Sequence, residues 1–217
     1  MSVLDRFFAQ FSGPRGPLGH LAGWLMARKN LALNGWIAEL AEVGPGDRAL
    51  EVGFGPGLLV ARLSERAAFV AGVDRSEVML QQALRRNARV AREGRVELRL
   101  GRADELPFDD ACFTHACSVN SLQFWPSVED GLGEIRRVLA GRGRLVLAQR
   151  MHREGVGRFD RSRFGMSEAR VGEIASTLEG AGFERVALRW RDFGSETIAA
   201  LMAHRAIERR AACGVMG

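Results

Sequence analysis

An acidic residue followed by three alternating glycines is the feature of this sequence that points most directly to chemistry. Residues 49–63 read ALEVGFGPGLLVARL, so an apolar run passes through Glu51 and then meets Gly53, Gly55 and Gly57. Glycine adopts positive φ angles and, because it has no Cβ, allows a ligand to approach the backbone closely. The stretch therefore predicts a turn from a strand to a helix that binds a small molecule. A glycine-rich turn without a ligand is the plainer alternative.

A second carboxylate ends the next apolar run. The segment FVAGVD finishes at Asp74, and in a doubly wound sheet this position lies at the carboxyl end of the strand beside the glycine turn. A carboxylate there can accept hydrogen bonds from both hydroxyls of a ribose. Asp74 therefore indicates a nucleoside, unless it only caps the DRS turn that follows.

A third apolar run leads into a polar turn. In VELRLGRADELPFDD a strand ends at Leu100, and the backbone N–H of Ala103 and the carboxylate of Asp104 follow closely enough to contact a purine. Asp104 as an ordinary loop acid is the alternative. With Asp74, this segment extends the expected ligand from a ribose to a base.

The spacing of the glycines separates two kinds of nucleotide. A nicotinamide dinucleotide site favours Gly-x-Gly-x-x-Gly, whereas here the glycines alternate, Leu58 follows the last of them and Glu51 precedes the first. The pattern disfavours a nicotinamide-dependent oxidoreductase, which stays open as the alternative function.

A parallel sheet is needed to bring these residues together. From residue 46 onward, β-rich runs alternate with helical patterns, which is typical of βαβ units. The expected strands are 48–53, 68–73, 96–100, 114–119 and 144–149, and the expected helices are 57–65, 77–92, 128–139 and 167 to about 180. Ser76 and Ser127 are the expected N-caps of the second and third helices.

Two further runs close the chain without a helix between them. Residues 180–190 and 196–205 therefore predict an antiparallel hairpin at one sheet edge. The fold class is α/β: a Rossmann-like, doubly wound, seven-stranded mixed sheet with an antiparallel edge hairpin, helices on both faces and a helical N-terminal extension.

The N-terminal extension is expected to contain two helical pieces, 3–11 and about 19–40. Met26, Asn30 and Asn34 share one face of the second piece, and this face either roofs a ligand or is a solvated stripe. We expect one domain over 1–217, in which 1–45 is a helical lid segment, 46–204 the Rossmann-like core and 205–217 a tail.

Five motifs occur in a fixed order along the chain: LEVGFGPG, GVD, GRADELPF, FTHACSVNSLQFWPS and EIRRVLAGRGRLVLA. In this order they resemble the class I S-adenosylmethionine-dependent methyltransferases, and among these the ubiquinone/menaquinone-biosynthesis-type (type 11) branch. The resemblance covers roughly residues 40–190. It implies methyl transfer from S-adenosylmethionine to oxygen, carbon, nitrogen or sulfur of a small organic acceptor, with S-adenosylhomocysteine as product.

The resemblance also implies which residues meet the cofactor. The first glycines and Glu51 would line the methionine and ribose portion, Asp74 would hold the ribose, residues 102–104 would meet the adenine, and Ser118 would face the methionine moiety. The full expected set is Glu51, Gly53, Gly55, Gly57, Asp74, Arg75, Arg102, Ala103, Asp104 and Ser118. The family often has Asp where this chain has Arg102, so the side chain that meets the adenine amine stays open.

The acceptor is expected just beyond the fourth strand, at the edge where open α/β sheets bind ligands. Asn120 and Gln123 are placed to orient a polar acceptor, and Trp125 is placed to form a wall. The alternative is a loop that packs its aromatic side chains inward.

Two other segments bear on the acceptor. Phe11 and Trp24 add large apolar side chains ahead of the first strand, and Arg158 lies in an arginine-rich stretch suited to carboxylate or phosphate oxygens. These residues favour a small, largely apolar acceptor, with an anionic group as one option. Packing aromatics and solvated arginines are the alternative.

Little further catalytic machinery is required by this reaction. The sulfonium of S-adenosylmethionine activates the methyl group, so the protein chiefly aligns and desolvates the reactants, effects that together reach roughly 7–11 kcal/mol. His152 is the best-placed base, with a surface or packing role as the alternative.

The composition argues against several other classes. The net charge is +5, but the 26 acidic residues are mixed among the 31 basic ones, so we expect no nucleic-acid partner. A nucleic-acid methyltransferase is the less favoured alternative, since SVNSLQFW lacks an Asn/Asp-Pro-Pro-aromatic tetrad.

The three cysteines form no CxxC and predict no metal site. Without an apolar run of about eighteen residues, no membrane span is predicted, and we expect a cytoplasmic monomer or homodimer.

Overall fold

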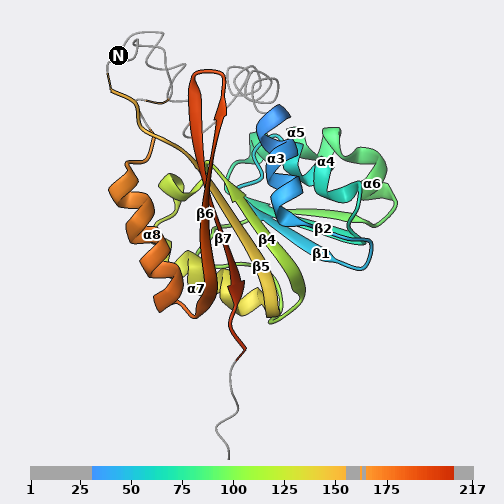
Figure 1. The fold of residues 1–217 in the computed structure, drawn as a ribbon. Helices are drawn as coiled ribbons and strands as arrows, with labels where there is room; N and C mark the ends of the chain where they lie inside the picture. The colour runs from blue at the N-terminus through green and yellow to red at the C-terminus, as the bar shows by residue number, and fades with distance from the viewer. Residues whose placement is uncertain (1–30, 155–161, 163–164, 208–217) are drawn as a thin grey trace, which may run out of the picture.

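One sheet contains the strands of the described residues, which are 31–154, 162 and 165–207 of a computed structural model. The strands are β1 (Arg48–Val52), β2 (Phe69–Asp74), β3 (Val96–Leu100), β4 (Phe113–Val119), β5 (Leu139–Arg150), β6 (Phe183–Phe193) and β7 (Glu196–Arg205). Their order is β3-β2-β1-β4-β5-β7-β6 (Figure 1). β1 to β5 run parallel, and β7 is antiparallel to β5 and β6. The predicted seven-stranded mixed sheet with an antiparallel edge hairpin is confirmed.

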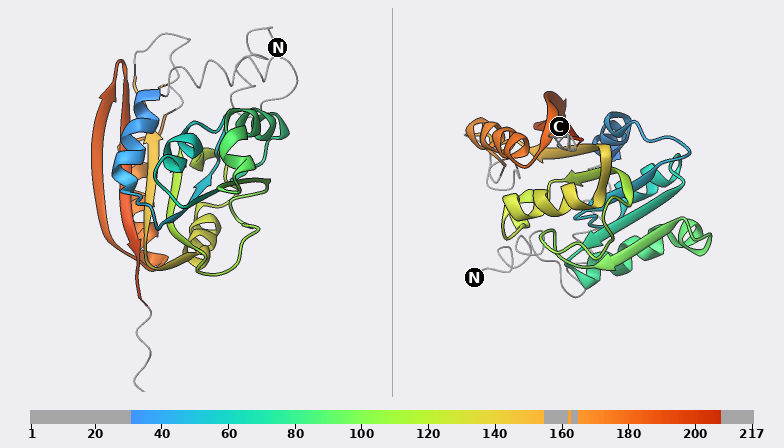
Figure 2. Two further views of the ribbon diagram at one scale, coloured as in Figure 1. Left: turned by 90° about the vertical axis from the view of Figure 1, so that its right-hand side faces the viewer. Right: turned by 90° about the horizontal axis from the view of Figure 1, so that it is seen from below.

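Helices cover both faces of this sheet. They are α3 (Leu31–Ala41), α4 (Leu58–Ser64), α5 (Glu77–Arg86), α6 (Ala88–Arg92), α7 (Val128–Val138) and α8 (Glu168–Gly180), with a short 3-10 helix, η1, at Leu122–Phe124. α3 to α6 lie on one face and α7 and α8 on the other (Figure 2). This confirms the predicted Rossmann-like α/β class.

The sheet has a hydrophobic core on each face, which explains why its central strands are nearly continuous apolar runs. Along β5, Leu145 and Leu147 join the core beneath α7 and α8, while Val146 and Ala148 join the core beneath α3 and α4. A parallel sheet covered by crossover helices must bury both faces of its strands. The alternation also fixes the strand register, since a slip by one residue would exchange the two cores.

Serine side chains begin three of the helices. Ser76 accepts a hydrogen bond from Met79 N at 3.4 Å and Ser127 accepts one from Asp130 N at 3.0 Å, which confirms both predicted N-caps. Ser167 does the same for α8. A side-chain oxygen at this position satisfies one of the free N–H groups of the first turn.

Two predicted boundaries are wrong for local reasons. The helix expected over 77–92 is broken at Asn87, which has φ −100° and a buried side chain bonded to Ala83 O and Gly57 O. The strand expected from 144 begins at Leu139, because Leu139 already pairs with Phe113 before an irregularity in the register.

The described part of the N-terminal extension is helical. α3 is the end of the helix predicted over 19–40, whereas the predicted helix at 3–11 lies outside the described residues. In the ranges that the structure describes, no helix has the length and apolarity needed to cross a membrane.

Candidate active site

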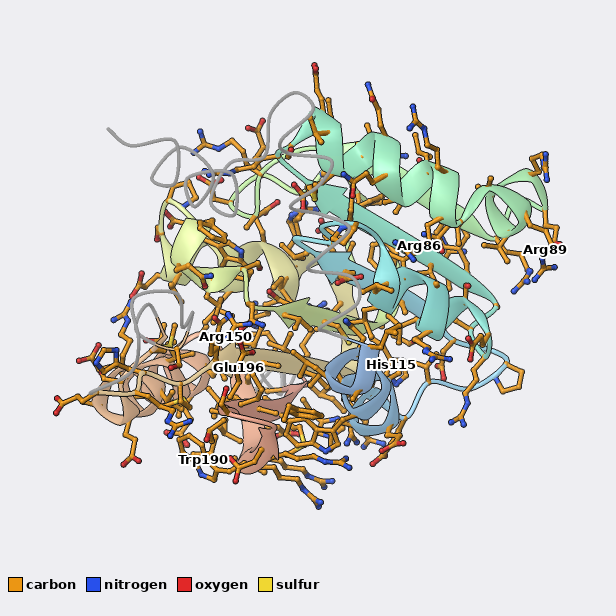
Figure 3. The ribbon with its side chains drawn as sticks, turned by 90° about the horizontal axis from the view of Figure 1, so that it is seen from above. Arg86, Arg89, His115, Arg150, Trp190 and Glu196 are labelled. Carbon is orange, nitrogen blue, oxygen red and sulfur yellow. The ribbon has the colours of Figure 1, made fainter. Side chains whose placement is uncertain are left out.

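The carboxyl ends of β1 to β4 surround a cavity of about 300 Å³. Figure 3 views the molecule from this end of the sheet. Of the residues expected at the cofactor, those lining the cavity are Glu51, Gly53, Gly55, Asp74, Arg75, Arg102 and Ala103. The fold thus joins residues from three separate strand ends at one site.

Asp74 links two of these strand ends. Its Oδ2 accepts a hydrogen bond from Gly55 N at 2.8 Å, and its Oδ1 accepts one from Ser76 N at 2.9 Å. Burial raises the pKa of Asp74, and the two backbone N–H groups oppose that rise. Each carboxylate oxygen keeps acceptor capacity after these bonds, so Asp74 can still accept bonds from a ligand.

The three glycines serve different purposes. All have positive φ, but a Cβ on Gly53 would lie 2.5 Å from the Cβ of Ser121, and a Cβ on Gly57 would lie 2.7 Å from the Cβ of Ala83. A Cβ on Gly55 would meet no atom of the described residues within 4 Å. Close approach within the protein therefore accounts for Gly53 and Gly57, and Gly57 does not line the cavity. Only Gly55 leaves open space for a ligand.

The end of α5 supports the glycine turn from below. Arg86 Nε donates to Pro56 O at 2.8 Å, and Asn87 Nδ2 donates to Gly57 O at 3.1 Å. The first bond satisfies the Pro56 carbonyl, and the second adds to the hydrogen bond that Gly57 O accepts from Ala61 N at 3.2 Å. The turn is therefore held by side chains as well as by its own backbone.

Glu51 is an unusual buried acid at the cavity wall. It is 3% exposed, and its Oε2 has no hydrogen-bond partner among the described residues. Burial raises the pKa of Glu51 well above its usual range, the backbone N–H of Val60 opposes this, and the charge of Asp74 adds to the rise. A buried polar atom without a partner is suited to a ligand that brings a donor.

Ser121 takes the position that the sequence assigned to Ser118. Ser118 is fully buried, does not line the cavity, and lies 2.6 Å (Oγ to Oγ) from Ser121. Ser121 lines the cavity, donates to Val52 O at 3.1 Å and accepts from Trp125 Nε1 at 3.1 Å. The expectation that Ser118 faces the methionine moiety is therefore wrong, because Ser121 lies between it and the cavity.

Trp125 lines the same cavity but is also tightly packed. A Cβ on Gly131 of α7 would lie 2.4 Å from the indole ring. Trp125 therefore both forms part of the cavity wall and packs against α7, so the two interpretations of this side chain are compatible.

Asp104 is oriented away from the role that the sequence suggested. Its carboxylate pairs with Arg102 at 2.6 Å and does not line the cavity, whereas Arg102 and Ala103 do. Hydrogen bonding to Arg102 lowers the pKa of Asp104. The structure therefore places Arg102 and the Ala103 backbone at the cavity, with Asp104 holding the arginine.

Arg137 of α7 holds the irregular segment between β3 and β4. Its guanidinium donates to Leu106 O at 2.9 Å and to Phe108 O at 2.7 Å, while Glu134 accepts from Leu106 N at 2.8 Å. Arg137 Nε lies 2.7 Å from Glu134 Oε1. The pair fixes the segment that carries Arg102.

A second cavity, of about 430 Å³, lies against the first. Its lining follows β4 and β5 and reaches the start of α8: Asn120, Leu122, Gln123, Val128, Gln149, Arg150, His152, Gly165, Met166, Ser167 and Arg170. Asn120 and Gln123 line both cavities. His152, the expected base, belongs to the second cavity and not to the first.

Asn120 is fixed between β4 and β5. It has φ 51°, its N–H donates to Ala148 O at 2.8 Å, and its Oδ1 accepts from Arg150 N at 2.7 Å. Asparagine tolerates this left-handed conformation better than most residues. The wall between the two cavities is therefore held by backbone bonds on both sides.

For several residues the structure differs from the sequence prediction or does not describe the residue. Asn34 is 6% exposed and lines the first cavity, so the solvated-stripe interpretation is wrong for this residue. Phe54, Ser121, Gln149 and Arg150 line the cavities and were not anticipated. Phe11, Trp24, Met26, Asn30 and Arg158 lie outside the described residues.

Comparisons with known proteins agree with this geometry. Residues 50–147 match a family model described as a methyltransferase domain. The uncharacterized methyltransferase YdaC of Bacillus subtilis (strain 168) is 28% identical over 178 residues, which cover 81% of this chain and 93% of YdaC. The demethylmenaquinone methyltransferase of Clavibacter sepedonicus is 35% identical over 115 residues, which cover 52% of this chain and 46% of that protein. The chain thus spans less than half of the Clavibacter enzyme.

A solved structure shares the fold. The crystal structure of an S-adenosylmethionine-dependent methyltransferase from Aquifex aeolicus has a TM-score of 0.66 at 21% identity and covers 80% of this chain and 89% of that one.

The glycine turn, Glu51 and Asp74 thus lie at the carboxyl edge of a sheet with the fold of known methyltransferases. These similarities support a class I S-adenosylmethionine-dependent methyltransferase with S-adenosylmethionine as the methyl donor. The nicotinamide-dependent alternative is thereby set aside.

Proposed function

We propose that the methyl donor occupies the first cavity and that a small organic acceptor occupies the second. The observation that carries this arrangement is the shared wall, since Asn120 and Gln123 line both cavities. Methyl transfer in line requires donor and acceptor to meet at one boundary, and proximity with correct orientation is the main effect that such an enzyme supplies.

The residues of the first cavity fit S-adenosylmethionine. The unpaired Glu51 Oε2 suits the ammonium of the methionine portion, the remaining acceptor capacity of Asp74 suits the ribose hydroxyls, and the space above Gly55 admits the chain between them. Arg102 and the Ala103 backbone flank the adenine position. When bound, S-adenosylmethionine supplies a methyl group activated by its sulfonium.

The second cavity fits a largely apolar acceptor with an anionic group. Leu122, Val128 and Met166 offer apolar contact, while Arg150 and Arg170 contribute positive charge. The Clavibacter relative is named for demethylmenaquinone, which supports a small organic acceptor. His152 is the candidate base at this cavity.

The N-terminal residues and Arg158 extend this proposal. We propose that Phe11, Trp24 and Arg158 contact the acceptor, with 1–45 acting as a lid. α3 already contributes Asn34 to the first cavity, which supports an approach of the preceding chain to the site. Deleting residues 1–18 should abolish methyl transfer and leave cofactor binding intact, whereas joint loss of folding and cofactor binding would contradict the lid.

The proposal as a whole is tested in two measurements. Calorimetry should detect binding of S-adenosylhomocysteine and none of NADH. A methyl-transfer screen across phenols, quinols, carboxylic acids and thiols, with product masses as readout, should then identify the acceptor class. Absence of S-adenosylhomocysteine binding would overturn the assignment of the first cavity.

A further inference from the structure

The hydroxyl of Ser121 joins the segments that follow β1 and β4. It donates to Val52 O at 3.1 Å, at the end of β1, and accepts from Trp125 Nε1 at 3.1 Å. Ser121 also lies directly against the glycine turn, because a Cβ on Gly53 would be 2.5 Å from its Cβ and 2.7 Å from its Oγ. All four residues line the first cavity. One buried side chain therefore holds two parts of the cavity wall together.

This hydroxyl has no bonding capacity left for a ligand. A serine hydroxyl has one proton to donate and two lone pairs that accept. The proton of Ser121 is used at Val52 O, and one lone pair is used by Trp125 Nε1. The second lone pair faces Ser118 Oγ at 2.6 Å, so Ser118 is the donor in the contact between the two serines. Ser121 thus contributes to the cavity through the groups that it holds.

The indole of Trp125 is fixed at both of its rings. Its five-membered ring donates through Nε1 to Ser121. Its six-membered ring lies against Gly131 of α7, where an added Cβ would be 2.4 Å from Cε3 and 2.8 Å from Cζ3. Rotation of the indole away from the cavity would separate the N–H from its partner and the ring from the helix. The hydrogen bond to Ser121 is therefore one of two contacts that set the orientation of this wall.

We propose that Ser121 is a positioning residue for the methyl donor, whose hydroxyl holds the Trp125 indole in place as a wall of the first cavity. This inference rests on the proposed function, because it takes the first cavity to be the donor site. A wall that is already ordered costs no ordering when the ligand binds. Loss of the hydrogen bond should therefore weaken donor binding, although Ser121 itself has no free bond to offer.

A double-mutant cycle in the binding of S-adenosylhomocysteine tests the inference. Ser121→Ala and Trp125→Phe break the same bond from its two ends, and each should weaken binding about three- to tenfold in a calorimeter. Because the serine acts through the indole, Ser121→Ala added to Trp125→Phe should cost less than about twofold more. An equal loss from Ser121→Ala in both backgrounds would overturn the inference. If Ser121→Ala does not fold, wild-type affinity in Trp125→Phe alone would overturn it.

Ser118→Ala is the matched control. It removes a hydroxyl from the same pair of serines and leaves the bonds from Ser121 to Val52 and Trp125 in place. Its melting temperature should fall, but its affinity for S-adenosylhomocysteine should stay within about twofold of the wild type. A loss of affinity as large as that of Ser121→Ala would show that the serine pair acts only through the stability of the fold, and would overturn the inference.

The indole N–H resonances in an NMR spectrum give a readout that a purely structural role would not move. The resonance of Trp125 is identified by its absence from the spectrum of Trp125→Phe. In Ser121→Ala it should shift and exchange faster with water, while the other indole resonances stay in place. An unchanged Trp125 resonance in folded Ser121→Ala would overturn the inference. Binding of S-adenosylhomocysteine to the wild type tests the proposed function separately.

Discussion

The backbone N–H of Gly55 donates a 2.8 Å hydrogen bond to Oδ2 of Asp74. This bond joins the turn after β1 to the end of β2, so the glycine turn and the strand-end carboxylate form one unit. A ligand that binds Asp74 therefore also contacts a backbone whose position Asp74 itself fixes.

Substitution of Asp74 should lower the affinity for the cofactor more than it lowers the stability of the fold. Asp74→Ala removes the proposed acceptor for two ribose hydroxyls and leaves the Gly55 and Ser76 N–H groups without this partner, so we expect a loss of about 1–3 kcal/mol in the binding of S-adenosylhomocysteine. Calorimetry measures it. Asp74→Asn, which keeps one oxygen, should lose less. A decrease in affinity below about threefold for Asp74→Ala would rule out the ribose role.

Alanine at two of the glycines should separate binding from stability. Gly55→Ala places a methyl group in the open cavity, so it should reduce cofactor affinity while the left-handed backbone costs only about 1–2 kcal/mol of stability. Gly57→Ala meets Ala83 at 2.7 Å and should lower the melting temperature further. Thermal unfolding of both variants without ligand, followed by calorimetry, gives the comparison. Equal melting temperatures would show that the contact with α5 is unimportant.

The stability contributed by Glu51 should fall as the pH rises. Because burial raises the pKa of Glu51 in the folded state, the protonated form stabilises the fold fully below the ordinary value of about 4.3 and this contribution is lost as the pH rises through the higher folded value. Glu51→Gln keeps the side chain neutral. Its melting temperature should match the wild type near pH 4 and exceed it increasingly toward pH 9. Parallel curves for the two proteins would exclude a protonated Glu51.

Arg137 should influence the cofactor without touching it. Arg137→Met releases the carbonyls of Leu106 and Phe108, so we expect a loss on the order of 2 kcal/mol in unfolding free energy and weaker binding of S-adenosylhomocysteine. Urea unfolding and calorimetry measure the two effects. Arg89→Met, on the exposed face of α6, is the control and should change neither. Unaltered cofactor affinity in Arg137→Met would mean that the segment after β3 holds its shape unaided.

The sequence predicts the sheet and much of the lining of the first cavity, because both depend on local patterns. Alternating glycines between a strand and a helix, and an acid that ends the next strand, are readable along the chain. Their meeting at one cavity follows from the parallel order of β1 and β2. The predicted positions of Glu51 and Asp74 needed no further information.

The remaining errors come from contacts between distant segments. Whether Ser118 or Ser121 faces the cavity depends on how the chain turns after β4, where Asn120 adopts a positive φ. Asp104 is diverted by Arg102, and Gly57 is required by the approach of α5. Gln149 and Arg150 end a strand whose preceding residues are apolar. The sequence does not indicate that these two polar side chains are buried.

The residues that line the two cavities also come from different parts of the sequence, which overlap only around Asn120 and Gln123. Every described residue that lines the first cavity precedes residue 127, and every described residue that lines the second lies at residue 120 or later. Under the proposed assignment of the two cavities, substitutions, insertions or exchanged segments beyond α7 therefore alter the acceptor site while the first cavity keeps its lining. Such a division makes the C-terminal portion of the chain the natural target for redesign, and a route by which one ancestral methyltransferase could diversify its substrates.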